Sequence, residues 1–118
     1  SPTIVMKNNE LFFTTGSPGG SRIISAVLQS ILNIIDFEMN LEEATYAKRI
    51  HHQWQPDILE IELSIDDKIK SELEAMGYEI RIRRPLTCIQ TIMYKNKMYS
   101  GYGDFRRPDA FASGNIND

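Results

Sequence analysis

Two adjacent glycines in the segment TTGSPGGSRI, residues 14–23, are the residues of this sequence whose backbone could do chemistry. Gly19 and Gly20 can supply the positive φ angles of a strand-to-helix turn. A phosphate-binding loop is a second interpretation, but the P-loop lysine is absent and the spacing fits neither GxxxxGK nor GxGxxG. A third is an anion-binding nest at a helix N-terminus, whose N–H groups can hold the oxyanion of an acyl-transfer intermediate. The local sequence leaves the turn and the nest open.

Three other groups of side chains are candidates for chemistry. His51 and His52 are adjacent, so their side chains point apart, and no cysteine or carboxylate lies near them at ligand spacing. We expect a structural role, with Trp54 packing and a histidine bonding to the backbone. Residues 106–109, RRPD, can bind an anion or provide an Arg–Asp pair that fastens the C-terminal segment. Cys88 is expected to be a small buried residue.

Length and composition limit the class of protein. The 118 residues predict one domain, and 42% apolar with 25% charged residues are ordinary values for a folded soluble chain. The net charge of −3 argues against nucleic acid or an anionic membrane as the partner. A single cysteine excludes an internal disulfide and a cysteine-rich metal site. We expect no metal and no cofactor. The start SPTIVM, without an initiator methionine, is typical of a processed product or a cut piece.

Hydrophobic periodicity and turn residues predict the elements that would position these groups. The predicted order is a hairpin of residues 3–6 and 11–15, a helix over 21–36, a helix from 40 to about 48, a loop over 50–57, a strand over 58–63, a helix over 66–77, a strand over 78–84, a hairpin of 88–94 and 97–102, and a loop-like tail over 103–118. Strands in pairs favour an α+β fold.

Two of the predicted helices carry specific signals. Asn40 and Glu43 have the spacing of a capping box at the start of the second helix. The helix over 21–36 is apolar around most of its circumference, with only a narrow polar stripe that includes Ser25 and Gln29. We therefore expect an additional partner surface to cover this helix.

Three separated motifs together resemble one family. The segment SPTIVMKNNELFFTTGSPGGSRI is similar to the region after the twin-serine loop in the small subunit of gamma-glutamyltranspeptidases. NLEEATYAKRIHHQWQPD resembles the helix and HHQW segment of that family, and GDFRRPDAFASG resembles its C-terminus. The motifs run from residue 1 to about 114 in the family's order, which is more specific than any glycine pair.

This resemblance implies a fold, a reaction and a site. The family consists of N-terminal-nucleophile hydrolases with an αββα sandwich, in which a freed threonine transfers the gamma-glutamyl group of glutathione or a related amide to water or an amine. It implies that Gly19 and Gly20 are the oxyanion-hole residues, acting through backbone N–H groups, and that they bind substrate. The nucleophilic threonine and the twin serines have no counterpart in this sequence, and Thr14 and Thr15 are not at a chain start.

We therefore expect residues 1–118 to be a single-domain fragment from the C-terminal part of a small subunit, inactive alone. Its expected partners are the large subunit, the rest of the small subunit and a gamma-glutamyl substrate such as glutathione. Exposed apolar surface makes a homo-oligomer possible. We expect neither nucleic acid nor a membrane as a partner. The family resemblance implies a periplasmic or secreted parent protein. The alternatives are a non-catalytic binding or assembly module of the same fold, or the equivalent piece of a cephalosporin-type acylase.

Overall fold

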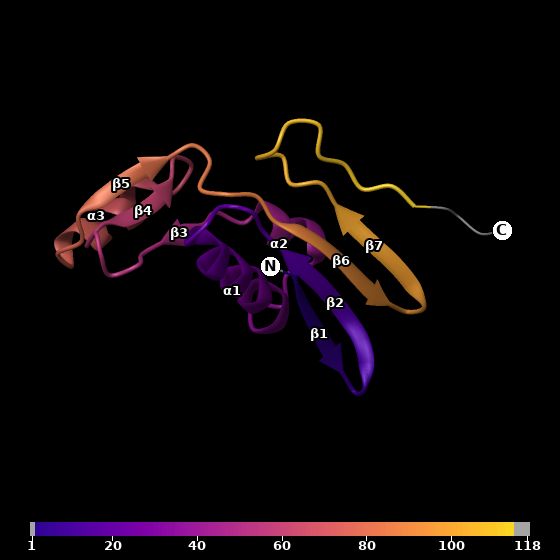
Figure 1. The fold of residues 1–118 in the computed structure, drawn as a ribbon. Helices are drawn as coiled ribbons and strands as arrows, with labels where there is room; N and C mark the ends of the chain where they lie inside the picture. Colours follow the sequence, from indigo (N-terminus) through magenta and orange to yellow (C-terminus); the bar gives the residue numbers. More distant parts are fainter. Residues whose placement is uncertain (1, 115–118) are drawn as a thin grey trace.

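The computed structural model describes residues 2–114, which form two β-sheets and three helices (Figure 1). In chain order the elements are β1 (Thr3–Lys7), β2 (Glu10–Gly16), α1 (Arg22–Ile35), α2 (Leu41–Tyr46), β3 (Ile50–His51), β4 (Leu59–Glu62), α3 (Asp67–Ala75), β5 (Ile80–Arg83), β6 (Gln90–Lys95) and β7 (Met98–Tyr102). One sheet has the order β1-β2-β6-β7 and the other β3-β4-β5. The α+β class predicted from the sequence is confirmed.

The four-stranded sheet is antiparallel throughout and is built from two hairpins. Asn8 and Asn9 turn the first hairpin and Asn96 and Lys97 the second, all with positive φ between 53° and 63°. Two consecutive left-handed residues make the turn that matches the twist of the flanking strands, and asparagine tolerates this region well. Both predicted hairpins are confirmed.

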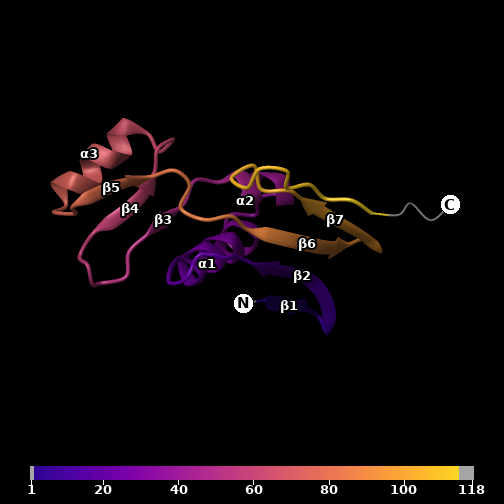
Figure 2. The ribbon, with the colours of Figure 1, turned by 45° about the horizontal axis from the view of Figure 1, so that its top comes forward.

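The three-stranded sheet is mixed. The short strand β3 pairs antiparallel with β4, and β4 pairs parallel with β5 through the crossover helix α3. A two-residue strand therefore begins the segment 50–57, which was predicted to be a loop throughout. Figures 1 and 2 show this sheet and α3 at one end of the molecule and the four-stranded sheet at the other, with α1 between them.

The core lies on one face of the four-stranded sheet, where α1 and α2 pack. Its buried residues are Phe13, Ile34, Leu41, Ala44 and Met93. The register between β1 and β2 shifts after Val5, so two residues of β2 lie opposite one residue of β1. This bulge lets Phe12 join Phe13 at the core, with the ring centroids 5.1 Å apart. The other face of the sheet has no helix against it within residues 2–114.

The helix α1 packs differently from its pattern. Its buried residues are Ala26, Ser30 and Ile34, three positions four apart, and the two small ones bring the helix close to its neighbours. The apolar side chains of Ile24 and Leu28 are 76% and 53% exposed. Periodicity identified the helix correctly, but it did not identify which side of an almost wholly apolar helix this chain covers.

The capping box predicted at the start of α2 is confirmed. Asn40 Oδ1 accepts from the Glu43 N–H, and the Glu43 carboxylate accepts from the Asn40 N–H, each at 2.9 Å. The helix α2 ends at Tyr46, two residues before the predicted end. Gly77 has a φ of +98° directly after the last turn of α3, as a helix stop requires. The described tail, residues 103–114, contains no helix or strand, and residues 115–118 of the predicted loop-like tail lie outside the described residues.

Candidate functional site

The loop between β2 and α1, residues 17–21, carries the two glycines that the sequence predicts as backbone donors. Gly19 has a φ of +123° and Gly20 a φ of +61°, which lie in the region that L side chains rarely adopt. Ser17 is buried, whereas Pro18, Gly19 and Gly20 are exposed. The loop therefore presents bare backbone to a molecule approaching from outside.

The hydrogen bonds of the loop leave two donors available. The carbonyl oxygens of Gly19 and Gly20 accept from the N–H groups of Arg22 and Ile23, at 3.3 and 3.2 Å. Within residues 2–114, the N–H groups of Gly19 and Gly20 themselves donate to no acceptor. Two adjacent unpaired N–H groups are what an oxyanion or another small anion requires.

The start of α1 adds electrostatic support. The helix has 14 residues, no acidic residue in its first turn, and no side-chain hydrogen bond from Ser21 at its N-cap. The positive end of its dipole therefore faces the loop without a neutralising carboxylate on the helix itself. An anion bound at the loop would gain from this field.

The two glycines are required for different reasons. A Cβ atom on Gly19 would lie 2.9 Å from Thr87 Oγ1 and 3.3 Å from Thr87 Cβ, closer than side-chain contacts normally come. A Cβ atom on Gly20 would meet nothing within 4 Å. Gly19 is thus constrained both by its backbone angle and by Thr87, and Gly20 by its backbone angle alone.

An ion-pair cluster lies next to the loop. The Arg22 guanidinium donates to both oxygens of Glu60 at 2.6 and 3.0 Å, and Arg83 Nε donates to the same carboxylate at 2.8 Å. The hydrogen bonds from Arg22, and then those from Arg83, lower the pKa of Glu60 to about 2 although burial opposes them. The carboxylate is therefore charged at neutral pH and fastens the first residue of α1 to β4.

A second cluster fastens the C-terminal segment. Arg106 donates to both oxygens of Glu62, at 2.6 and 2.7 Å, and to Asp104 at 3.1 Å. Arg49 Nη1 donates to Asp104 at 2.9 Å. Burial raises the pKa of Asp104, but Arg49 and two backbone N–H donors outweigh burial, so this pKa lies below its ordinary value.

This cluster corrects the predicted partner of the RRPD motif. An Arg–Asp pair does fasten the segment, but the acid is Asp104, two residues before the motif, rather than a residue within it. In the parallel pairing of β4 with β5, Glu62 lies opposite Arg83, yet Glu62 binds Arg106 and Arg83 binds Glu60. Arg106 and Glu62 are 44 positions apart in the sequence, so no local pattern could predict that they form a pair.

The histidines are structural, as predicted. His51 Nδ1 lies 2.7 Å from Ser25 Oγ, which joins β3 to the polar stripe of α1. His52 Nδ1 accepts from the Trp54 N–H at 3.2 Å, and its Nε2 lies 2.9 Å from an Asp57 oxygen. The predicted packing of Trp54 is wrong, because its side chain is 76% exposed. Across residues 2–114, no group of three or more His, Cys, Asp and Glu side chains is arranged to hold a metal ion.

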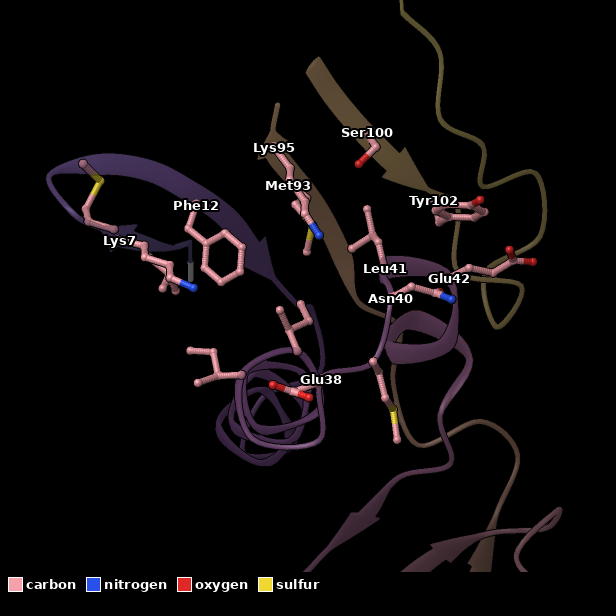
Figure 3. A pocket seen from close by; sticks show the side chains of 15 residues that line it. Lys7, Phe12, Glu38, Asn40, Leu41, Glu42, Met93, Lys95, Ser100 and Tyr102 are labelled. Atoms are coloured by element: carbon pink, nitrogen blue, oxygen red, sulfur yellow. The ribbon is translucent and has the colours of Figure 1, made fainter. Parts of the chain in front are cut away.

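Cys88 is buried, as expected. A groove of about 840 Å³ lies between the β1–β2 hairpin, the end of α1 and α2, with Phe12, Leu41 and Met93 on its apolar walls (Figure 3). Neither Gly19 nor Gly20 lines it. In the part of the chain from 2 to 114, the helices fall short of the length and apolar character needed to cross a membrane.

Comparisons with known proteins agree on one family. The family model described as gamma-glutamyltranspeptidase matches residues 1–114. The chain is 42% identical over 116 residues to the glutathione hydrolase proenzyme of Escherichia coli (strain K12), covering 97% of the chain and 20% of that protein. It is 36% identical over 86 residues to the acylase ACY 1 proenzyme of Pseudomonas sp. (strain V22), covering 72% of the chain and 15% of that protein. The chain thus spans about a fifth of the length of the curated relatives it matches.

Solved structures give the same result. Gamma-glutamyltranspeptidase of Helicobacter pylori, as a T380A mutant, superposes with a TM-score of 0.85 at 46% identity, over 91% of this chain and 60% of that one. The enzyme of Pseudomonas nitroreducens, complexed with L-DON, superposes with a TM-score of 0.88 at 32% identity, over 100% of this chain and 62% of that one. A cephalosporin acylase of Bacillus halodurans shares the fold at 20% identity, with a TM-score of 0.85, over 98% of this chain and 22% of that one.

Proposed function

This chain belongs to the gamma-glutamyltranspeptidase family, and on that premise we propose that it supplies the oxyanion-binding loop of an enzyme that transfers or hydrolyses gamma-glutamyl groups. The donors are the N–H groups of Gly19 and Gly20. The observation that carries the proposal is that both N–H groups are unpaired within the described residues, on an exposed loop at the N-terminus of α1.

The chemistry follows from where negative charge develops. When a nucleophile attacks the gamma-glutamyl carbonyl, the carbonyl oxygen becomes an oxyanion, and preorganised N–H donors stabilise this charge more than they stabilise the neutral carbonyl. The same two N–H groups stabilise the oxyanion both when the acyl-enzyme forms and when water or an amine later attacks it. The positive end of α1 contributes in the same direction.

The nucleophile comes from outside this chain in the proposed enzyme. Thr15 is buried, and its hydroxyl lies 2.8 Å from Thr91 Oγ1, so it is a sheet residue rather than an accessible nucleophile. Thr14 lies in the same strand. We assign the attacking threonine to another part of the parent protein, and we expect residues 1–118 alone to be inactive.

The expected partners follow from the same proposal. The rest of the small subunit and the large subunit complete the substrate pocket, and the substrate is glutathione or a related gamma-glutamyl amide. Exposed apolar side chains such as Ile24 and Leu28 give additional surface for these partners or for a second copy. No cofactor takes part, and the parent protein is exported to the periplasm or secreted.

A direct test uses a chimera. Residues 1–118 would replace the matched segment of the Escherichia coli glutathione hydrolase proenzyme, which is 42% identical. We expect the chimera to process itself and to release p-nitroaniline from gamma-glutamyl-p-nitroanilide. A mature, correctly assembled chimera without any turnover would contradict the proposal, and would favour a non-catalytic module of the same fold.

The donors themselves are tested by a single atom change. Proline cannot replace Gly20, because a φ of +61° is incompatible with its ring. Replacement of Gly20 by glycolic acid changes its amide N–H to an ester oxygen, and the residue can still adopt a positive φ. We expect kcat for the mature chimera to fall by about 100-fold or more. The same ester at Gly114 in the tail is the matched control, and equal kcat for both esters would refute the assignment.

An acylase of the cephalosporin type is the second candidate. The 36% identity to the acylase ACY 1 proenzyme favours it, and an amide carbonyl of either substrate needs the same oxyanion donors. Sequencing upstream of Ser1 and assaying the resulting full-length protein against gamma-glutamyl anilide and a glutaryl- or cephalosporin-linked amide separates the two. A start codon directly before Ser1 would contradict both enzymes.

A further inference from the structure

Thr87 lies against the glycine loop from a distant part of the sequence. It belongs to the segment between β5 and β6, and its side chain is buried. Its hydroxyl donates to the carbonyl oxygen of Pro18 and lies 2.8 Å from Ser17 Oγ, which in turn lies 2.7 Å from the same carbonyl oxygen. Three oxygen atoms therefore form a closed triangle beneath the loop.

The number of hydrogens in this triangle decides what it can do. Ser17 and Thr87 contribute one hydroxyl hydrogen each, so only two of the three contacts carry a hydrogen at once. Every possible arrangement leaves the Pro18 oxygen with at least one donor. While both hydroxyls donate within the triangle, the Pro18 carbonyl keeps a donor, and the Thr87 hydroxyl is the one that ties this carbonyl to the segment between β5 and β6.

The position of the Pro18 carbonyl sets the direction of the Gly19 N–H. The two groups belong to one planar trans peptide, in which the C=O and the N–H point in opposite directions. A carbonyl held toward Thr87 turns the Gly19 N–H away from Thr87, on the exposed side of the loop. Because Gly19 has no Cβ, Thr87 can approach this closely.

Thr87 is itself held by the second ion-pair cluster. Arg49 Nη1 donates to the Thr87 carbonyl oxygen at 3.2 Å and to Asp104 at 2.9 Å. Asp104 also accepts from the Ile89 N–H at 2.8 Å, two residues after Thr87. The support beneath the loop is thus fixed by buried charge-assisted hydrogen bonds rather than by a free side chain.

We propose that Thr87 is a positioning residue, whose hydroxyl fixes the Pro18–Gly19 peptide so that the Gly19 N–H faces the substrate oxyanion. This inference rests on the proposed oxyanion function of the loop. Thr87 does not touch substrate. It acts through the peptide plane, so its loss should lower the rate of the chemical step more than it weakens substrate binding.

The test compares two substitutions in the mature chimera. Thr87→Val keeps the shape and removes the hydroxyl, and Thr87→Ser keeps the hydroxyl. We expect Thr87→Val to lower kcat about 10-fold with KM changed less than about twofold, as the loss of one orienting hydrogen bond predicts. We expect Thr87→Ser to remain within about threefold of the parent kcat. Amide exchange in the peptide covering residues 16–23 should rise in the valine variant only.

Two results separate this inference from the function on which it rests. If the glycolate at position 20 abolishes turnover while Thr87→Val matches Thr87→Ser in kcat and in amide exchange, the positioning role is refuted and the oxyanion assignment stands. If the glycolate at position 20 leaves kcat unchanged, the oxyanion assignment is refuted, and the positioning role is refuted with it even where exchange rises.

Discussion

At the scale of single residues, the site depends on a few buried polar groups that join distant segments. The Glu60 carboxylate forms ion pairs with Arg22 at the start of α1 and with Arg83 in β5. The Glu62 carboxylate forms an ion pair with Arg106 in the tail. The buried Glu60 carboxylate remains charged because hydrogen bonds from Arg22 and Arg83 replace water and lower its pKa. The charge state of Glu60 therefore affects the stability of the region that carries the loop.

The pH dependence of stability tests this role for Glu60. Its folded-state pKa of about 2 lies below the value of about 4.3 expected in the unfolded chain, so its stabilising effect is complete above about pH 4.3 and disappears as the pH falls toward 2. At about 1.4 kcal/mol for each pKa unit, the effect amounts to about 3 kcal/mol. Glu60→Gln should therefore flatten the decrease of Tm between pH 5 and 2, measured by thermal unfolding of the chimera.

The matched comparison is Glu74→Gln, on the exposed side of α3, where the Glu74 carboxylate lies 3.9 Å from Lys70 Nζ. An exposed pair of this kind contributes about 0 to 1 kcal/mol, so this variant should keep the parent profile. Identical acid profiles for the parent chimera and Glu60→Gln would contradict the assigned role of Glu60.

At the scale of elements, the sequence predicted the helices and hairpins from local signals but did not predict how they pack. Hydrophobic periodicity, turn residues and the capping box of α2 are local signals, so the sequence alone located both hairpins and the three helices of the described residues. The covered side of α1 was not predictable, because it depends on where β2, β3 and α2 lie. The contact of Thr87 with the glycine loop also depends on the positions of distant segments. A single threonine forms no sequence pattern, and its partners Ser17 and Pro18 lie about 70 positions away.

The capping box of α2 gives a prediction for an element. Asn40→Ala removes the side-chain acceptor of the Glu43 N–H and should destabilise the chain by about 1 kcal/mol, because one N–H at the start of a short helix loses its partner. Asn40→Asp keeps an acceptor and is the control. Urea unfolding of the chimera measures both, and equal midpoints for the alanine and aspartate variants would contradict the capping role.

At the scale of the whole molecule, the described part of the chain is extended, and no helix of residues 2–114 covers the second face of the four-stranded sheet. Its radius of gyration is 15.7 Å, compared with about 13 Å for a compact domain of this length. Ile4 and Ile92 are 66% and 52% exposed, and they lie in one row with Thr14 on the face of the four-stranded sheet opposite α1 and α2. One helical layer on one sheet is half of an αββα sandwich, so we expect a second sheet to cover this face.

Substitution of Ile92 tests this arrangement. Ile92→Asp would place a charge between the two sheets, and we expect the yield of soluble, processed chimera to fall at least about fivefold because a buried unpaired charge is costly. Ile92→Leu keeps the face apolar and should give the parent yield. Equal yields of processed enzyme from the aspartate and leucine variants would show that the face remains in water.

The contact between Thr87 and the glycine loop has a consequence for the order of folding. During synthesis the loop leaves the ribosome about 70 residues before the threonine that holds it, since Ser17 and Thr87 are 70 positions apart. The turn and α1 can form early from local contacts, whereas the Pro18–Gly19 peptide receives its support only when most of this segment has been made. A chain still being synthesised would therefore carry the glycines but not yet the fixed donors, and the proposed oxyanion site would be among the last features of the segment to form.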